Sequence, residues 1–195
     1  MGVLEDVLCR VDSTDGSRRR RGCETGARLR YLGRPADSAV RCISLHVLGT
    51  ALLDNERAEE ALLVLEADLA LKRRYWSDPK FNAEDFILVT QKKVVECLNS
   101  VGRLDEALVC QREIYERHVG KNGVSHERTI RSGSVVAGLL IELDLWNEAK
   151  TLWRNLLRAA RRSLGEDHDI TLSLYENLAS ALILDRENTR DNLCV

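Results

Sequence analysis

Two histidines lie beside carboxylic acids at an interval of 42 residues. His126 precedes Glu127 in the stretch KNGVSHERTI (121–130), and His168 lies between two aspartates in SLGEDHDITL (163–172). Histidine beside a carboxylate is the usual material of metal sites and of general bases. The alternative is that each histidine marks a junction between structural repeats. The position of the two histidines relative to the surrounding helices distinguishes these two interpretations.

Both histidines belong to a longer shared pattern, Gly-x-x-His-x-x-Thr. The two copies align Gly123, His126 and Thr129 with Gly165, His168 and Thr171. Glycine can close a helix in the left-handed conformation, and a short polar side chain can cap the helix that follows. We therefore expect Gly165 to end one helix, and Asp167 or Asp169 to cap the next. Gly123 and Ser125 take the same roles one repeat earlier.

A catalytic role for the two histidines is the weaker reading. Catalysis needs partner groups that converge in a pocket, whereas residues one repeat apart on a solenoid lie about 10 Å or more apart. The sequence also shows no glycine-rich phosphate loop, no serine or cysteine nucleophile motif and no paired-carboxylate signature. We predict that the protein is not an enzyme.

Composition favours packed helices in a cytoplasmic protein. Only 5% of the 195 residues are aromatic and only two are prolines, which is atypical of a sandwich or barrel and predicts an all-α fold. The six cysteines form no CxxC pair and no Cys–His cluster at zinc spacing, so we expect reduced thiols, no metal site and no cofactor. No apolar run approaches the ~20 residues of a membrane span, and the formal net charge of -2 gives no reason to expect a membrane partner.

Residues 38–195 follow the apolar period of amphipathic helices, in pairs joined by tight turns. The predicted units are helix-turn-helix repeats at about 38–80, 83–124 and 125–166, followed by a half-repeat at 167–195. The second helix of each full repeat opens with Glu-Ala, and a small or modest residue lies 12 positions before each of these alanines. The alanines are Ala61, Ala107 and Ala149, and the earlier residues are Gly49, Val95 and Ala137. This pattern predicts that the two helices of a repeat approach closely.

Residues 1–37 lack this period and are expected to form a flexible, Arg-rich tail. The run from Arg18 to Arg21 is typical of a nuclear localisation signal or a nucleic-acid patch. Acids at Asp12, Asp15 and Glu24 dilute it, so a solvated tail is the preferred reading and nucleic acid is not the expected partner.

The stretch LGEDHDITLSLYENLASAL (164–182) resembles the junction and first helix of tetratricopeptide (TPR) repeats of the kinesin-light-chain type. The resemblance rests on the 42-residue period, the LGxDH turn and the NLA that follows. It implies an α-α superhelix, a right-handed TPR solenoid of about three and a half repeats. The sequence departs from the family at the aromatic position of the first helix, which only Tyr175 keeps, and at Asp68, where a small packing residue is usual.

The resemblance also implies a concave groove lined by the first helices, which would bind an extended peptide segment of a partner protein. Side chains at the positions that face this groove in the family carry both signs of charge, which argues against a purely acidic ligand. These positions are His46 and Thr50, then Lys92, Glu96 and Asn99, then Arg131 and Ser134, and finally Glu176 and Ser180.

Three functions remain open at this stage. The first is a protein-binding adaptor or scaffold that uses this groove. The second is a structural role in which the unpaired helix of the half-repeat docks another subunit or a further domain, self-association included. The third is nucleic-acid binding through the Arg-rich tail, which would show steep salt dependence.

Overall fold

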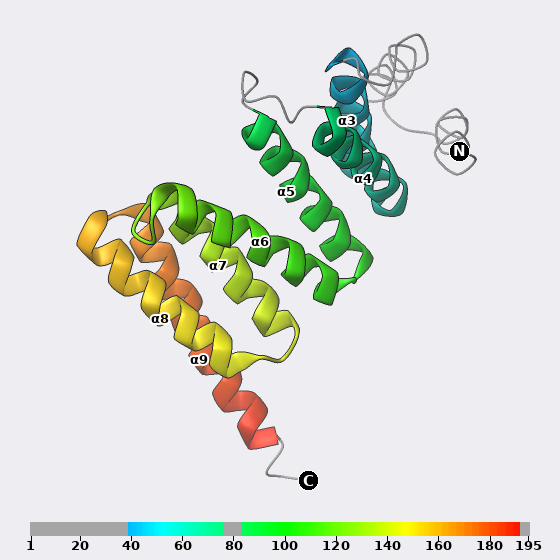
Figure 1. Cartoon of the computed structure of the whole chain (residues 1–195). Coiled ribbons are helices and arrows are strands. Elements are labelled where there is room, and N and C mark those ends of the chain that lie inside the picture. Colours follow the sequence, from blue (N-terminus) through cyan, green and yellow to red (C-terminus); the bar gives the residue numbers. More distant parts are fainter. Residues whose placement is uncertain (1–38, 76–82, 192–195) are drawn as a thin grey trace. The chain divides into compact units, whose positions relative to one another are not determined.

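The computed structural model describes residues 39–75 and 83–191, and within these ranges all regular structure is α-helical (Figure 1). The helices are α3 (Ala39–Asp54), α4 (Ala58–Tyr75), α5 (Ala83–Val101), α6 (Leu104–Asn122), α7 (Glu127–Glu142), α8 (Trp146–Ser163) and α9 (Asp169–Asp191). The predicted Arg-rich tail, residues 1–37, lies outside the described residues. Helix follows helix at the predicted turns, so the all-α fold is confirmed.

The chain forms two compact units, the first ending at Arg103 and the second beginning at Leu104. In the first unit, α4 packs against both α3 and α5. Aliphatic side chains from all three helices are almost completely buried, with Leu45 and Leu52 on α3, Leu65 on α4 and Leu98 on α5 among them. Burial of such side chains contributes about 1.5–3 kcal/mol each and is the main force that holds the three helices together.

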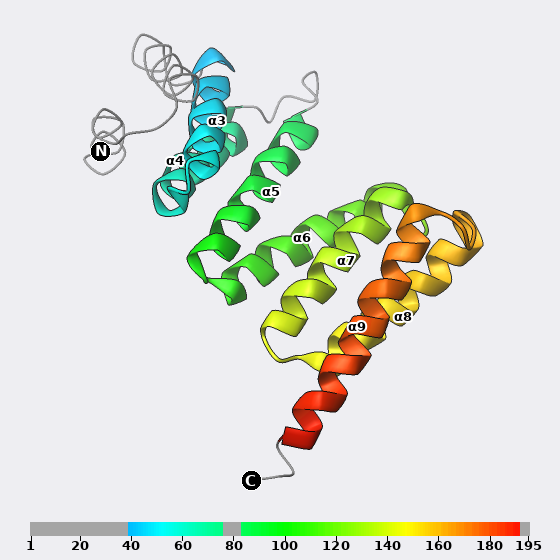
Figure 2. The same ribbon diagram turned by 180° about the vertical axis from the view of Figure 1, so that it is seen from behind.

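In the second unit each helix packs against the next, so that α7 lies against α6 and α8, and α8 lies against α9 (Figures 1 and 2). Helix α7 also touches α9 directly. The fully buried side chains Ile114, Ile130, Leu140 and Leu174 come from α6, α7 and α9, and Trp153 of α8 is almost fully buried beside them. The buried apolar side chains of α6, α7, α8 and α9 therefore form one continuous core in this unit.

The small residues predicted from the repeat pattern do lie where helices approach closely. A Cβ atom added at Gly49 of α3 would lie 2.5 Å from Cγ of Leu65 on α4, which is inside van der Waals contact. The Glu-Ala alanines Ala61, Ala107 and Ala149 are all fully buried, as is Ala137. The close approach that the pattern predicts is therefore present between α3 and α4, and the burial of the alanines agrees with it.

The turn inside each repeat uses one residue in the left-handed conformation. These residues are Glu56, Gly102 and Asp144, with φ of 63°, 80° and 60°. In each turn the next N–H bonds a carbonyl five residues back, as Arg57 does to Leu52 (3.0 Å) and Leu145 does to Leu140 (2.8 Å). The backbone motif thus repeats even though glycine, the residue best suited to it, is present in only one of the three turns.

None of the described helices is both long and apolar enough to cross a lipid bilayer.

We predict that Gly49→Ala lowers the free energy of unfolding by about 1 kcal/mol or more, because overpacking costs about 1–3 kcal/mol and the gain in helix propensity offsets only part of it. The matched control is Gly138→Ala, since nothing lies within 4 Å of a Cβ added at this second helical glycine. That change should raise stability by about 0.5–1 kcal/mol. Urea unfolding followed by circular dichroism measures both, and a stabilised Gly49→Ala variant would contradict the close-approach argument.

Candidate functional site

The recurring histidines cap helices. His126 is the N-cap of α7, and its Nδ1 accepts a hydrogen bond from the backbone N–H of Arg128 at 3.1 Å. His168 immediately precedes α9, and its Nδ1 accepts from the N–H of Ile170 at 3.3 Å. The prediction that nearby serine or aspartate side chains would be the caps is therefore wrong. In both caps the imidazole Nδ1 accepts the hydrogen bond that a serine or aspartate oxygen usually accepts, and the N–H that donates it lies two residues later.

The recurring glycines and threonines complete the same junction. Gly123 and Gly165 have φ of 82° and 97°, which confirms their predicted left-handed conformation. Thr129 Oγ1 donates to the carbonyl of His118 (3.2 Å), and Thr171 Oγ1 donates to the carbonyl of Gly165 (2.7 Å). Each threonine is fully buried and ties its helix to the end of the preceding one. Hydrogen bonds to the backbone thus explain the whole repeated pattern.

No cluster of three or more His, Cys, Asp or Glu side chains that could hold a metal ion occurs among the residues that the structure describes. Cys97 is fully buried. Burial, together with the nearby carboxylates of Glu96 and Glu66 and against the lowering effect of Lys93, raises the pKa of this thiol to about 11. The thiol therefore stays protonated at neutral pH and is a poor nucleophile.

In the first unit, the predicted groove residue His46 contacts a buried polar cluster that sequence reasoning missed. Lys72 Nζ on α4 donates to Asp68 Oδ2 at 2.6 Å and to Thr90 Oγ1 of α5 at 2.7 Å. His46 Nδ1 on α3 lies 3.7 Å from the same Asp68 oxygen and 3.4 Å from Thr90 Oγ1. Asp68 and Thr90 are fully buried and Lys72 nearly so. The cluster links all three helices of the unit.

The other predicted groove residues of the first unit lie near the surface. Thr50 is partly buried and donates its hydroxyl to the carbonyl of His46 (2.9 Å), so its polar group is already used within its own helix. Lys92 and Asn99 of α5 are exposed, and Glu96 is exposed and paired with Lys93 at 2.6 Å. Lys92 and Asn99 are therefore the residues of this set that remain available to a ligand.

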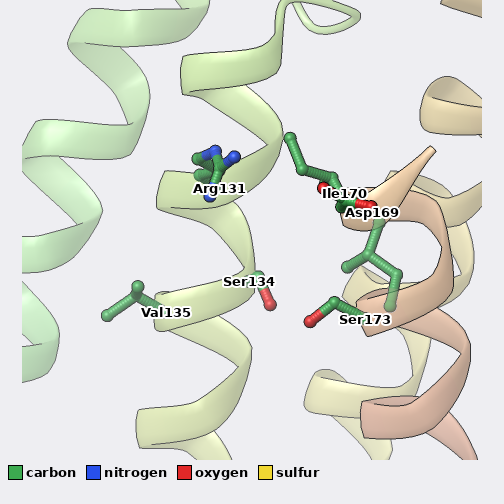
Figure 3. Close-up of a pocket in the computed structure, with 7 residues that line it drawn as sticks. Arg131, Ser134, Val135, Asp169, Ile170 and Ser173 are labelled. Carbon is green, nitrogen blue, oxygen red and sulfur yellow. The ribbon is translucent and has the colours of Figure 1, made fainter. Parts of the chain in front are cut away.

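In the second unit a hollow of about 500 Å³ opens between α7 and α9 (Figure 3). Its lining residues are Arg131, Ser134, Val135, Asp169, Ile170, Ser173 and Leu174. Both helices are first helices of their repeats, as the groove prediction requires. The predicted residues Arg131 and Ser134 line this hollow, whereas Glu176 and Ser180, although exposed, are not among its lining residues.

Several polar groups at the hollow are held in place by one hydrogen bond and can still form another with a ligand. Trp153 Nε1 donates to Ser134 Oγ at 3.3 Å, which leaves the Ser134 hydroxyl free to donate to a ligand. Arg131 bonds Glu127 through Nε (3.0 Å), so its two terminal nitrogens remain available. Figure 3 shows Ser173 on α9 pointing across the hollow towards Ser134 on α7.

Asp169 and Ser173 are site residues that sequence reasoning missed. The signal that could have found them is the repeat interval, because Ser173 lies 42 residues after Arg131, and Asp169 lies 42 residues after Glu127.

Comparison with known proteins identifies the repeat. Residues 129–169, which hold α7, α8 and the junction after them, match the family model of the tetratricopeptide repeat. The chain contains a tetratricopeptide repeat. No curated protein sequence gives a significant match to the chain.

Solved structures extend the likeness from this TPR repeat to the whole fold. Two structures of TPR-like repeats that are nearly identical to one another, described as those of a kinesin light chain of Podosopora anserina, match with a TM-score of 0.73 at 16% identity. They cover 96% of this chain, which covers 88% and 89% of theirs. BtubC (BKLC) from P. vanneervenii matches with a TM-score of 0.62 at 14% identity, over 95% of this chain and 68% of its own. The predicted resemblance and the TPR solenoid fold class are confirmed.

We predict that Thr171→Val, which keeps the shape of the side chain, lowers the free energy of unfolding by about 1 kcal/mol, because the Gly165 carbonyl loses its bond at the TPR junction. Thr151→Val is the matched control, since Thr151 is exposed on α8 and bonds only the carbonyl of Asn147 in its own helix. Its effect should stay within about 0.5 kcal/mol. Thermal unfolding of the two variants measures the difference, and equal stability would contradict the junction role.

We also predict that Lys72→Met costs about 3–5 kcal/mol of stability, because it leaves the buried Asp68 carboxylate without its ion pair. The double variant Asp68→Leu, Lys72→Met should regain most of that loss. Lys93→Met, which breaks an exposed pair with Glu96, should cost less than about 1 kcal/mol. Chemical denaturation of the four proteins tests this, and a small effect of Lys72→Met would show that water reaches Asp68.

Proposed function

We propose that the protein is a non-enzymatic adaptor that holds an extended segment of a partner protein in the hollow between α7 and α9. TPR repeats in general are scaffolds for protein–protein interaction. The observation that carries the finer proposal is that this hollow collects unused polar groups from two successive first helices, with apolar side chains between them.

The groups at the hollow favour a ligand whose backbone is extended and accessible. Ser134 and Ser173 face each other and can bond the free carbonyl and N–H groups of such a segment, which a helical ligand does not offer. Val135, Ile170 and Leu174 provide apolar surface for alternate side chains. Two serine hydroxyls beside an aliphatic surface can bind a peptide better than they can bind a small, highly charged metabolite.

The charges at the hollow favour a ligand of mixed sign. The terminal nitrogens of Arg131 can form a charge-assisted hydrogen bond with a carboxylate of the ligand. Asp169, at the first turn of α9, has no partner among the described residues and would attract a lysine or arginine. This agrees with the mixed charge expected from the sequence, and a purely acidic segment would meet repulsion from Asp169.

The proposal extends to the first unit through the exposed residues Lys92 and Asn99 of α5. Residues at the repeat position of Arg131 are apolar in that unit, because Val89 lies 42 residues before Arg131, and Ile43 lies 46 residues before Val89. Both are about half-exposed. At this repeat position the first unit thus offers aliphatic surface on α3 and α5, whereas the second unit offers polar groups on α7 and α9.

The remaining parts of the proposal concern organisation and place. We take residues 38–195 as the TPR array, with repeats at about 38–80, 83–124 and 125–166 and a half-repeat at 167–195. A cytoplasmic location agrees with the scattered cysteines.

A short peptide selected from a random displayed library on the full chain provides the probe for this groove. We predict that Arg131→Glu weakens binding of that peptide about tenfold or more, because a hydrogen bond to a charged group contributes about 1.5–3 kcal/mol. Fluorescence anisotropy with the labelled peptide measures the affinity, which we expect to be on the order of micromolar for so small an interface.

The matched control is Arg154→Glu, which makes the same change of charge on the exposed surface of α8, away from the hollow. It should leave the affinity nearly unchanged. Lys92→Glu with Asn99→Ala tests the contribution of the first unit in the same way. Equal loss of binding in the Arg131 and Arg154 variants would show that net charge, rather than the groove, holds the peptide.

A further inference from the structure

An apolar stripe runs along the exposed face of α9. Leu172, Tyr175 and Leu182 are 47%, 40% and 43% exposed, and the small residue Ala179 is exposed between them. Their spacing of three, four and three residues places all four on one side of the helix, as in the seam of a coiled coil. Isolated apolar residues are common on protein surfaces, but a continuous stripe indicates an interaction site.

The same face of the preceding first helix is covered. The residues of α7 that lie 42 positions before the stripe are Ile130, Gly133, Ala137 and Leu140, and all four are buried. A Cβ at Gly133 would meet Leu156 of α8 at 2.8 Å and Tyr115 of α6 at 2.9 Å, so the helices on both sides of α7 cover this face. Helix α9 packs against α8 on one side, and no helix among the described residues covers the other side. The stripe therefore continues the helix-on-helix interface that already exists inside the unit.

The stripe is complementary to itself when it is reversed. The four positions are symmetric about residue 177, so an antiparallel copy of α9 places Leu172 opposite Leu182, and Tyr175 opposite Ala179. A large ring then faces a small side chain at both inner positions, and leucine faces leucine at both ends. Two-fold symmetric interfaces require this kind of self-complementary surface.

We propose that a second copy of this chain covers the stripe, with the two α9 helices packed antiparallel about a two-fold axis. The last turns of α9 extend past α8 in both views (Figures 1 and 2). Lys150 Nζ on α8 pairs with Asp185 Oδ2 at 2.6 Å and neutralises the carboxylate next to the end of the stripe. This interface is separate from the α7–α9 hollow and does not depend on the peptide-binding proposal.

Sedimentation equilibrium of the full chain over a concentration series tests the pairing. We expect a reversible monomer–dimer equilibrium, and Leu182→Asp should raise the dissociation constant at least about tenfold, which corresponds to one buried leucine. Leu184→Asp is the matched control, because Leu184 is 49% exposed but lies off the stripe on the other side of the same helix. It should leave the equilibrium unchanged.

Circular dichroism of both variants confirms that each remains folded. A chain that is monomeric at every concentration would overturn the proposal, since the stripe would then belong to a different partner. A dimer that is insensitive to Leu182→Asp would overturn it as well, because another surface would hold the two copies together.

Cross-linking tests the antiparallel order. Chains carrying Leu172→Cys are mixed with chains of different size carrying Leu182→Cys and are mildly oxidised. The antiparallel pair predicts mixed disulfides between the two chains, above the level that the native cysteines give in the unchanged protein. Disulfides that form only between identical variants would show a parallel pair and overturn the proposed geometry.

Discussion

Two pairs of helices in this chain approach closely because one helix of each pair has a glycine at the contact. Gly49 makes room for Leu65, and Gly133 makes room for Leu156, so in both units the first helix receives a leucine from the second. Close packing fixes the angle and register of the pair because a dense core cannot be deformed gradually. The turns, the junctions and the positions of the groove residues all follow from this fixed geometry.

The residues that recur and the residues that bind have separate tasks. Glycine, histidine and threonine recur at the two junctions that follow α6 and α8, where each histidine satisfies an equivalent backbone N–H at the start of the next helix. The groove positions change from one repeat to the next, from Val89 to Arg131 to Ser173. A solenoid can vary its recognition surface in this way because the packed core and the junctions, rather than the groove side chains, keep the helices in place.

Much of the fold could be predicted from the sequence, because helical period, glycine breaks and the Glu-Ala interval are local signals. The buried pair of Asp68 and Lys72 could not, since charged residues are read as exposed until a partner in space is known. The histidine caps were missed because shorter polar residues lie nearby and are the usual caps. Of the predicted groove residues, Arg131 and Ser134 line the hollow, whereas Glu176 and Ser180 on α9 do not.

The buried ion pair also limits how this sequence can change over generations. Loss of either charge alone leaves the other buried without its ion-pair partner at 2.6 Å, so a lineage that drifts through single substitutions meets an unstable intermediate at this point. The two positions must therefore change together or after another stabilising substitution. Related chains should keep both residues or have neither, which makes Asp68 and Lys72 a marker of shared descent within a fold whose other core positions can exchange one aliphatic side chain for another.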